Sequence, residues 1–459
     1  MVIFQTLIAF IALSVLITVH EYGHFIVARR CGVFIECFSI GFGKPLMSWY
    51  DSYGTHYIIC IFPLGGYVKM LESSSDIKNH LHSIKSFNNQ SLLHRAAIIS
   101  AGPLANFILA IICYWIIFIY GITNIKPIIS EVKKGSIAFQ SEITSNMELK
   151  SIADVNTDNW DDVRMALLTQ IGNKNIPVKL ALFDQVSHQK IIKKFIDLDH
   201  WHLDPYKQDP ITAFGINPYQ SSSTESIVDR IYPNSIASKI GLHAGDEILK
   251  VNGQSFKNWS DLMISLCNNF NQTIRLMIKR QSKIFSINFT DNLKHQLWKN
   301  GKCFFGAIPH HIPLDEKFQN QQKYNPITAL LMAGKRTWQL SKLTLRILKQ
   351  VIMGKLSLHT LSGPISIAQG AIISAKHGLL QCLMFLALIS INIGMMNLFP
   401  LPILDGGQIL FLLLEKIKGQ SLSDQFKKIS WNISTIFLIL IMTLTIFNDC
   451  SHILFNITN

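Results

Sequence analysis

The chain has 459 residues, of which 49% are hydrophobic and only 15% charged, with a net charge of +13 and a mean hydropathy of +0.27. Soluble domains carry about 25% charged residues, so an ordinary soluble enzyme and a disordered chain are both disfavoured. The basic balance could indicate nucleic acid. No Lys/Arg-rich run or aromatic-interleaved basic stripe supports that partner, so we expect an anionic membrane surface instead. The eight cysteines form no C-x-x-C pair, which argues against a disulfide framework or a cysteine-based zinc site.

Four apolar stretches predict transmembrane helices. The first is 1–28, which lacks the basic start and the small-residue exit of a cleaved signal peptide. The other three are 96–121, 378–404 and 429–448. We therefore predict a polytopic α-helical membrane protein with four transmembrane helices.

The basic residues of the short loops orient these helices. Arg29 and Arg30 follow the first span, four lysines separate the third from the fourth, and none follows the fourth. Since short cytoplasmic loops carry an excess of Lys and Arg, segments 29–95 and 405–428 are expected inside. Both termini and the long segment 126–375 are then expected outside.

The outer segment contains a duplicated small β-rich module, expected at 126–221 and again at 222–310. The second copy has the clear turn Gly241-Leu242-His243-Ala244-Gly245-Asp246, where the first has only Ser145-Asn-Met-Glu148. Ligand binding by the first copy is therefore in doubt. Residues 326–354 follow as a basic amphipathic helix that we expect to lie along the membrane surface.

An H-E-x-x-H sequence, His20-Glu21-Tyr22-Gly23-His24, ends the first span. On a helix the two histidines share one face and can bind one Zn²⁺, and Glu21 beside them can activate a water molecule. A polar helix end at the membrane interface is the alternative. Ionisable groups continuous with an apolar helix are costly in a bilayer and are functional by default, which favours the metal site.

A third ligand is expected at the same depth, because a catalytic zinc usually takes three protein ligands. The first and third spans run in the same direction, so the third ends level with the histidines. There Asn397 is followed by Pro400 and Pro402, which cannot lie in a regular helix interior, so the chain must unwind. Asp405 is the carboxylate of this stretch and is predicted to be the ligand. Asn397 either binds substrate, together with the two prolines, or caps the helix.

The sequences H-E-Y-G-H and N-L-F-P-L-P-I-L-D-G resemble the two signature motifs of the site-2 proteases, which are intramembrane zinc metalloproteases. Residues 95–106 are similar to that family's second-span pattern, and the resemblance covers essentially the whole chain. It implies that His20, His24 and Asp405 bind zinc and that Glu21 is the general base. It also implies two tandem PDZ-like modules in the periplasm of a Gram-negative cell, with the zinc site towards the cytoplasmic side of the inner membrane.

The same resemblance implies the substrates. These are single-span membrane proteins already cut on the periplasmic side by another protease, chiefly an anti-sigma factor, with remnant signal peptides as a further class. Their cleavage would activate an envelope stress response. We expect a monomer embedded in the lipid bilayer.

Residues 38–70 are β-branched and aromatic runs interrupted by glycine, and the resemblance implies a re-entrant β segment at the active site. We predict that strand 38–43, with Ile40, or strand 56–62, with Ile58, holds the substrate in extended form. A plain cytoplasmic hairpin is the alternative. The PDZ-like modules either bind C-terminal carboxylates by strand addition or exclude folded domains by their bulk.

Two other functions compete with an intramembrane protease. A membrane-anchored PDZ adaptor would leave the H-E-x-x-H sequence and the proline break without a role. A zinc protease with a cytosolic site would need its third ligand in a soluble helical domain, whereas segment 29–95 is short and strand-like.

Overall fold

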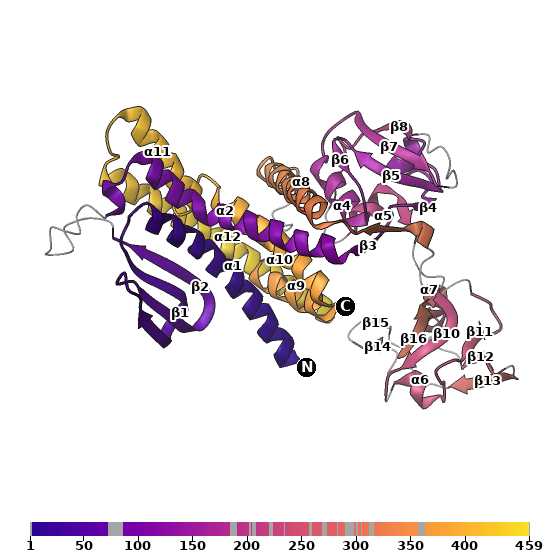
Figure 1. Ribbon diagram of the computed structural model, residues 1–459. Coiled ribbons are helices and arrows are strands. Elements are labelled where there is room, and N and C mark those ends of the chain that lie inside the picture. The colour runs from indigo at the N-terminus through magenta and orange to yellow at the C-terminus, as the bar shows by residue number, and fades with distance from the viewer. Residues whose placement is uncertain are drawn as a thin grey trace.

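The computed structural model comprises a helix bundle, a long β hairpin beside it and two modules beyond one end of the bundle (Figure 1). The predicted boundary between the modules, at 221 and 222, lies outside the described residues. The structure describes residues 2–71, 86–183, 191–201, 203, 208–219, 224–233, 235–256, 259–268, 273–281, 283–289, 298–299, 302–303, 305–311, 316–356 and 363–458.

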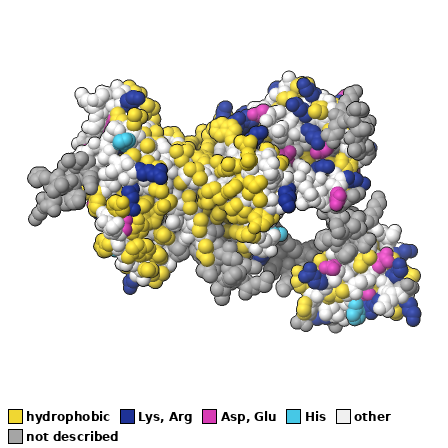
Figure 2. Space-filling view, in the orientation of Figure 1, with side chains coloured by type: hydrophobic (Ala, Val, Ile, Leu, Met, Phe, Trp, Pro, Cys, Tyr) yellow, Lys and Arg dark blue, Asp and Glu magenta, His cyan; other side chains and the backbone are white. Residues whose placement is uncertain are grey.

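The bundle is built from long apolar helices, and α2 packs against both α1 and α10. Within the described residues, α2, α10 and α12 are long and apolar enough to cross a membrane. That α1 is a fourth span stays a prediction. Figure 2 shows a broad hydrophobic surface over the bundle, whereas charged side chains gather on the modules. The bounds are α1 Val2–Arg30, α2 Leu92–Tyr120, α10 Leu379–Asn397 and α12 Asp424–Thr458.

The third predicted span is shorter than the sequence indicates, because α10 ends at Asn397 instead of continuing to residue 404. The chain is irregular across the two prolines, and a new helix, α11, runs Asp405–Lys418. A Cβ on Gly406 would lie 2.2 Å from the Leu398 carbonyl oxygen, so the returning helix start fits closely under the turn. Asp405 therefore lies at the start of α11 and not at the end of the span.

A helix that the sequence did not predict, α9 (Pro364–Lys376), precedes α10 and packs beside α1 and α12. The carboxylate of Asp449, on α12, accepts hydrogen bonds from the backbone N–H groups of Gly363, Ile365 and Ser366. A buried acidic side chain from one helix thus caps the first turn of another.

The hairpin consists of β1 (Ile35–Tyr50) and β2 (His56–Met70), which bend so that their halves form four side-by-side segments. Residues 37–40 are paired on both sides, with 56–59 and with 66–69. Residues 45–50 pair with 56–60. The two outer segments of this sheet are therefore 45–50 and 66–70.

The two modules share one order of elements: strand, short helix, strand, longer helix and three further strands. The first module adds the short strand β6 and the helix α5 to this order. The first has antiparallel sheets of order β6-β5-β7-β8 and β4-β9, and the second has one of order β13-β12-β11-β10-β16. The first comprises β4 Ile129–Val132, α3 Ile137–Gln140, β5 Met147–Ile152, β6 Val155–Asn156, α4 Trp160–Thr169, β7 Ile176–Leu182, β8 Ile191–Ile196, α5 Pro210–Phe214 and β9 Ile216–Pro218. The second comprises β10 Thr224–Ile231, α6 Ile236–Lys239, β11 Glu247–Val251, α7 Trp259–Asn268, β12 Ile274–Arg280, β13 Lys283–Phe289 and β16 Ala307–His311.

The short connecting elements complete the chain. They are the 3₁₀ turns Phe87–Asn89 and Glu316–Phe318, and the strand pairs β3 Ile122–Ile125 with β17 Gln319–Gln322 and β14 Trp298–Lys299 with β15 Lys302–Cys303.

The first module is joined to the bundle through α8 (Pro326–Ile352), and one buried apolar cluster runs from α2 and α10 through α8 into this module. Arg336 of α8 forms an ion pair with the buried carboxylate of Asp162, at 2.7 Å. The second module has an apolar core of its own. The first module is thus part of the body that carries the transmembrane helices.

Candidate metal centre

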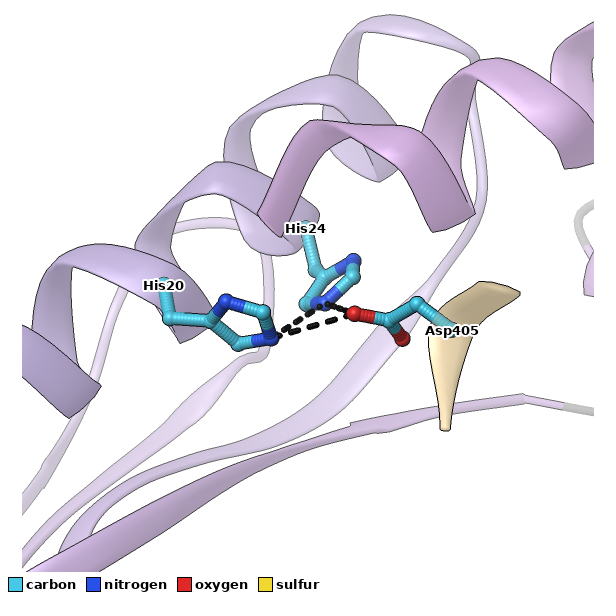
Figure 3. Close-up of side chains that lie close together, drawn as sticks. All are labelled: His20, His24 and Asp405. Atoms are coloured by element: carbon cyan, nitrogen blue, oxygen red, sulfur yellow. Dashed lines mark hydrogen bonds and ion pairs between the residues drawn. The ribbon is translucent and has the colours of Figure 1, made fainter. Parts of the chain in front are cut away.

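Three potential metal ligands converge beside the C-terminal half of α1 (Figure 3). The Nε2 atoms of His20 and His24 are 3.3 Å apart, and they lie 3.2 and 3.5 Å from Oδ2 of Asp405. Both histidines are buried, and Asp405 is partly buried. The three residues that the sequence singled out as ligands are thus brought together.

These separations suit a zinc ion. Donors held at about 2.0–2.1 Å from one tetrahedral ion are about 3.3–3.4 Å apart, which matches the three observed distances. Among the described residues, the buried Oδ2 atom of Asp405 makes no hydrogen bond, although the two imidazoles lie beside it. A buried carboxylate oxygen is costly unless it is compensated, and a cation bound between the three side chains would compensate it.

Close packing between α1 and α2 places the histidines. A Cβ on Gly23 would lie 2.3 Å from the Ala101 carbonyl oxygen, so this glycine lets the two helices approach closely. A Cβ on Gly102 would lie 2.2 Å from Nε2 of His24, so the imidazole ring lies directly over that glycine. The contact fixes the ring where its Nε2 faces Asp405.

The second nitrogen of each imidazole faces α2. Nδ1 of His24 is 2.9 Å from the carbonyl oxygen of Ile98, and Nδ1 of His20 is 3.2 Å from the amide nitrogen of Asn106. Sequence reasoning assigned no role to either residue of α2. The available signal was a single asparagine in an otherwise apolar span.

A cavity of about 970 Å³ adjoins the three ligands. Glu21 and Asn397 line it, as do Tyr67, Val68, Lys69 and Met70 from the last segment of β2. Val68 and Glu21 thus line the same cavity. The cavity therefore brings together a carboxylate, an amide, a strand edge and the candidate metal ligands.

The other residues predicted to bind substrate lie elsewhere. Pro400 and Pro402 form the turn between α10 and α11 and are not among the cavity's lining residues. Ile40 pairs with Ile59 and Gly66, and Ile58 pairs with Ser39 and Ser48. Both isoleucines belong to inner segments of the sheet, so neither offers the free strand edge that strand addition needs.

The turn Gly241–Asp246 connects α6 to β11 in the second module. Asp246 is fully buried and accepts a hydrogen bond from the His243 backbone N–H. It also accepts hydrogen bonds from Nε and Nη2 of Arg280, at 2.6 and 2.7 Å. Burial alone would raise the pKa of Asp246, but the bonds from Arg280 and His243 hold it below its usual value. Leu242 is buried beside it. These contacts stabilise the turn.

The first module keeps the backbone of this turn without its glycines. Gly241 and Gly245 have φ of +79° and +87°, and Glu142 and Asn146 occupy the matching left-handed positions with φ of +55° and +59°. Asparagine tolerates this conformation better than most residues. The unclear sequence of the first copy therefore does not mark a lost turn.

Comparison with known proteins agrees with this arrangement. The family model described as "Peptidase family M50" matches residues 8–441. Protease RseP of Yersinia pestis is 46% identical over 99% of this chain and 100% of its own length. The regulator of sigma-E protease RseP of Escherichia coli K12 is 44% identical over 96% and 97%, respectively. A Pasteurella multocida protein, provisionally named a zinc metalloprotease, is 37% identical over the same shares.

Proposed function

Because the chain belongs to peptidase family M50 and is a site-2 type zinc metalloprotease, we propose that it cuts single-span membrane proteins within or just beneath the bilayer. The observation that carries the proposal is the convergence of two histidines and one aspartate, 3.2–3.5 Å apart, beside a cavity that also holds a glutamate. An adaptor protein would need no such cavity.

His20, His24 and Asp405 are assigned as the zinc ligands and Glu21 as the general base. Zinc, when bound, polarises a peptide carbonyl and lowers the pKa of a water molecule to about 7. Glu21 takes up the proton of the attacking water on a carboxylate oxygen and delivers it to the leaving amine nitrogen. The Asn397 amide is placed to hold the substrate backbone.

The last segment of β2 is assigned as the substrate clamp, in place of the inner segments with Ile40 and Ile58. The N–H of Leu71 donates to the carbonyl of Phe34 on the first strand. Since N–H groups alternate along a strand, those of Val68 and Met70 face away from the sheet and towards the cavity. A helical substrate must open to be cut, and in a bilayer its freed backbone groups cost several kcal/mol unless they are paired again. An exposed strand edge can pair them.

The substrates are assigned by analogy with the relatives. Several relatives, among them the Escherichia coli protein, are named regulators of sigma-E, which supports an anti-sigma factor as substrate. We infer that it arrives already cut on its periplasmic side, that remnant signal peptides are a further substrate class, and that cleavage activates an envelope stress response. The enzyme would act as a monomer in the inner membrane. Both termini and both PDZ-like modules would be periplasmic, with the zinc site towards the cytoplasm.

Helix α8 is assigned to the periplasmic surface of the inner membrane. Its exposed side carries apolar residues seven apart, Leu331, Trp338, Leu345 and Ile352. Each of the first three is followed four residues later by a lysine, Lys335, Lys342 or Lys349. An apolar stripe beside a row of lysines suits the boundary between acyl chains and anionic headgroups.

The test compares Glu21→Gln with Asp405→Ala in full-length protein, using a model single-span substrate and a zinc determination. Glu21→Gln should keep its zinc and lose cleavage by at least about 10²–10⁴-fold, because only proton transfer is removed. Asp405→Ala should lose both zinc and cleavage. Near-normal cleavage by Glu21→Gln, or full zinc in Asp405→Ala, would overturn the assignments.

A further inference from the structure

A buried side-chain amide in the bundle has one end in contact with His20 and the other end unpaired. Nδ1 of His20 lies 3.2 Å from the side-chain nitrogen of Asn106 on α2, and Asn106 is fully buried. The oxygen of the same amide, Oδ1, is buried and has no hydrogen-bond partner in the part of the chain that the structure describes. Amide groups rarely remain unpaired when buried, so this position calls for an explanation.

The chemistry of the imidazole supplies one. Nε2 of His20 faces Asp405 and His24, and if its lone pair binds a cation the ring proton must reside on Nδ1. Nδ1 is then a donor and needs an acceptor, which an amide nitrogen cannot be. The two ends of an asparagine amide are assigned from hydrogen bonding, and turning this amide by 180° brings Oδ1 to Nδ1–H of His20.

His24 follows the same pattern. Its Nδ1 is 2.9 Å from the Ile98 carbonyl oxygen, which can only accept. In both imidazoles Nε2 faces Asp405 while Nδ1 faces α2. The backbone of Asn106 is held as well, because the Ser390 hydroxyl on α10 donates to its carbonyl oxygen at 2.8 Å. This contact with α10 thus holds the backbone of Asn106 in place.

We propose that Asn106 is a positioning residue whose amide oxygen accepts a hydrogen bond from Nδ1–H of His20, fixing the tautomer and orientation in which Nε2 binds zinc. The inference rests on the proposed function, since it assumes that His20 is a zinc ligand. Substituting a residue that hydrogen-bonds to a metal ligand in this way typically lowers metal affinity by about 10–100-fold.

The experiment measures zinc affinity by chelator competition on the full-length protein in detergent, together with the thermal stability of the metal-free form. Asn106→Leu removes the acceptor and should weaken zinc binding about 10–100-fold, while the metal-free protein melts near the parental temperature. Asn106→Asp keeps an acceptor and should bind zinc within a few-fold of the parent. Ser390→Ala removes the hydroxyl that donates to the backbone carbonyl of Asn106. It serves as the control and should also stay near the parent.

Parental zinc affinity in a folded Asn106→Leu protein would overturn the proposal. If the leucine variant does not fold, Asn106→Asp decides: a tenfold or greater loss of affinity overturns the proposal, and near-parental binding supports it. His24→Phe tests the premise separately. If the parent binds zinc no better than His24→Phe, the metal site itself is wrong and the proposal fails with it.

Discussion

Adding one methyl group at Gly102 should disable the metal centre. The Cβ of an alanine there would lie 2.2 Å from Nε2 of His24, and 2.6 and 2.8 Å from two carbons of the same ring. Ordinary contacts of a Cβ atom begin at 3.4 Å, so the ring must move by more than an ångström. Zinc–ligand distances tolerate only about 0.2 Å. His24 would therefore be lost as a ligand. We expect zinc affinity to fall by more than about 100-fold, which exceeds the loss caused by substituting a residue that hydrogen-bonds to a metal ligand.

Helix propensity acts in the opposite direction. Alanine favours a helix interior over glycine by about 0.8–1.0 kcal/mol, so propensity alone would make Gly102→Ala stabilising. Gly334 on α8 is a matched control, because nothing lies within 4 Å of the position of its Cβ. Gly334→Ala should keep full zinc and be neutral or slightly stabilising.

The assay is the zinc content of both purified variants, followed by chelator competition and cleavage of a single-span substrate. The reasoning requires that Gly102→Ala lose zinc and cleavage together while Gly334→Ala keeps both. Stoichiometric zinc bound to Gly102→Ala with parental affinity would show that His24 does not lie against α2 as described.

Three further outcomes are expected. Met70→Pro removes an N–H that faces the cavity without breaking the pairing within the sheet, so cleavage of a stable helical substrate should fall about threefold to tenfold with zinc retained; an unchanged rate would reject the clamp. Arg280→Ala should destabilise the second module by about 1–2 kcal/mol at neutral pH. This is the lower part of the range for a charged hydrogen bond, because the Arg280 side chain is 34% exposed and water weakens the ion pair. The pKa of Asp246 is lowered on folding. Its contribution to stability is therefore present above about pH 3.9 and is lost as the pH falls through the folded pKa. Hydrogen-exchange rates in the second module of the full-length parent and the variant should therefore converge in acid. Deleting 224–311 should let the enzyme cut substrates whose outer domains are still folded, and if only trimmed substrate is cut, the module is not a filter.

The deletion is confined to the second module because of the shared core. Removing both modules would expose apolar residues of α8 that pack against the first, among them Leu340 and Leu343. A loss of activity would then reflect damage to the bundle and not a role in substrate selection.

Sequence reasoning found the parts of the site that depend on local chain geometry. The i, i+4 spacing of His20 and His24 fixes both on one helix face whatever surrounds them. The steric limits of Pro400 and Pro402 require a break in the helix, and Asp405 follows it directly. These features needed no knowledge of how the helices pack.

Features set by contacts between distant segments could not be predicted. Gly102 and Asn106 matter because of the imidazoles that pack against them. A lone asparagine in a largely apolar span hints at a role, but it does not indicate which side chain Asn106 meets. The β segment was predicted, but periodicity does not reveal which of four strand segments is outermost, so the prediction named Ile40 and Ile58, which lie in inner segments. Helix α9 depends on a cap from Asp449, far away in the chain.

The continuity of the core between the first module and α2 has a mechanical consequence. The helix that bears Ile98, Gly102 and Asn106 beneath the imidazoles is also the helix whose other end is packed into that module. A force applied to the first module, such as the pull of a tethered protein, would therefore strain the metal centre directly. The second module has a core of its own, so a force on it would not pass into the bundle through this shared cluster. The two copies of the module would then differ in mechanical coupling. A force on the first would reach the metal centre through α2, whereas a force on the second would not take that route.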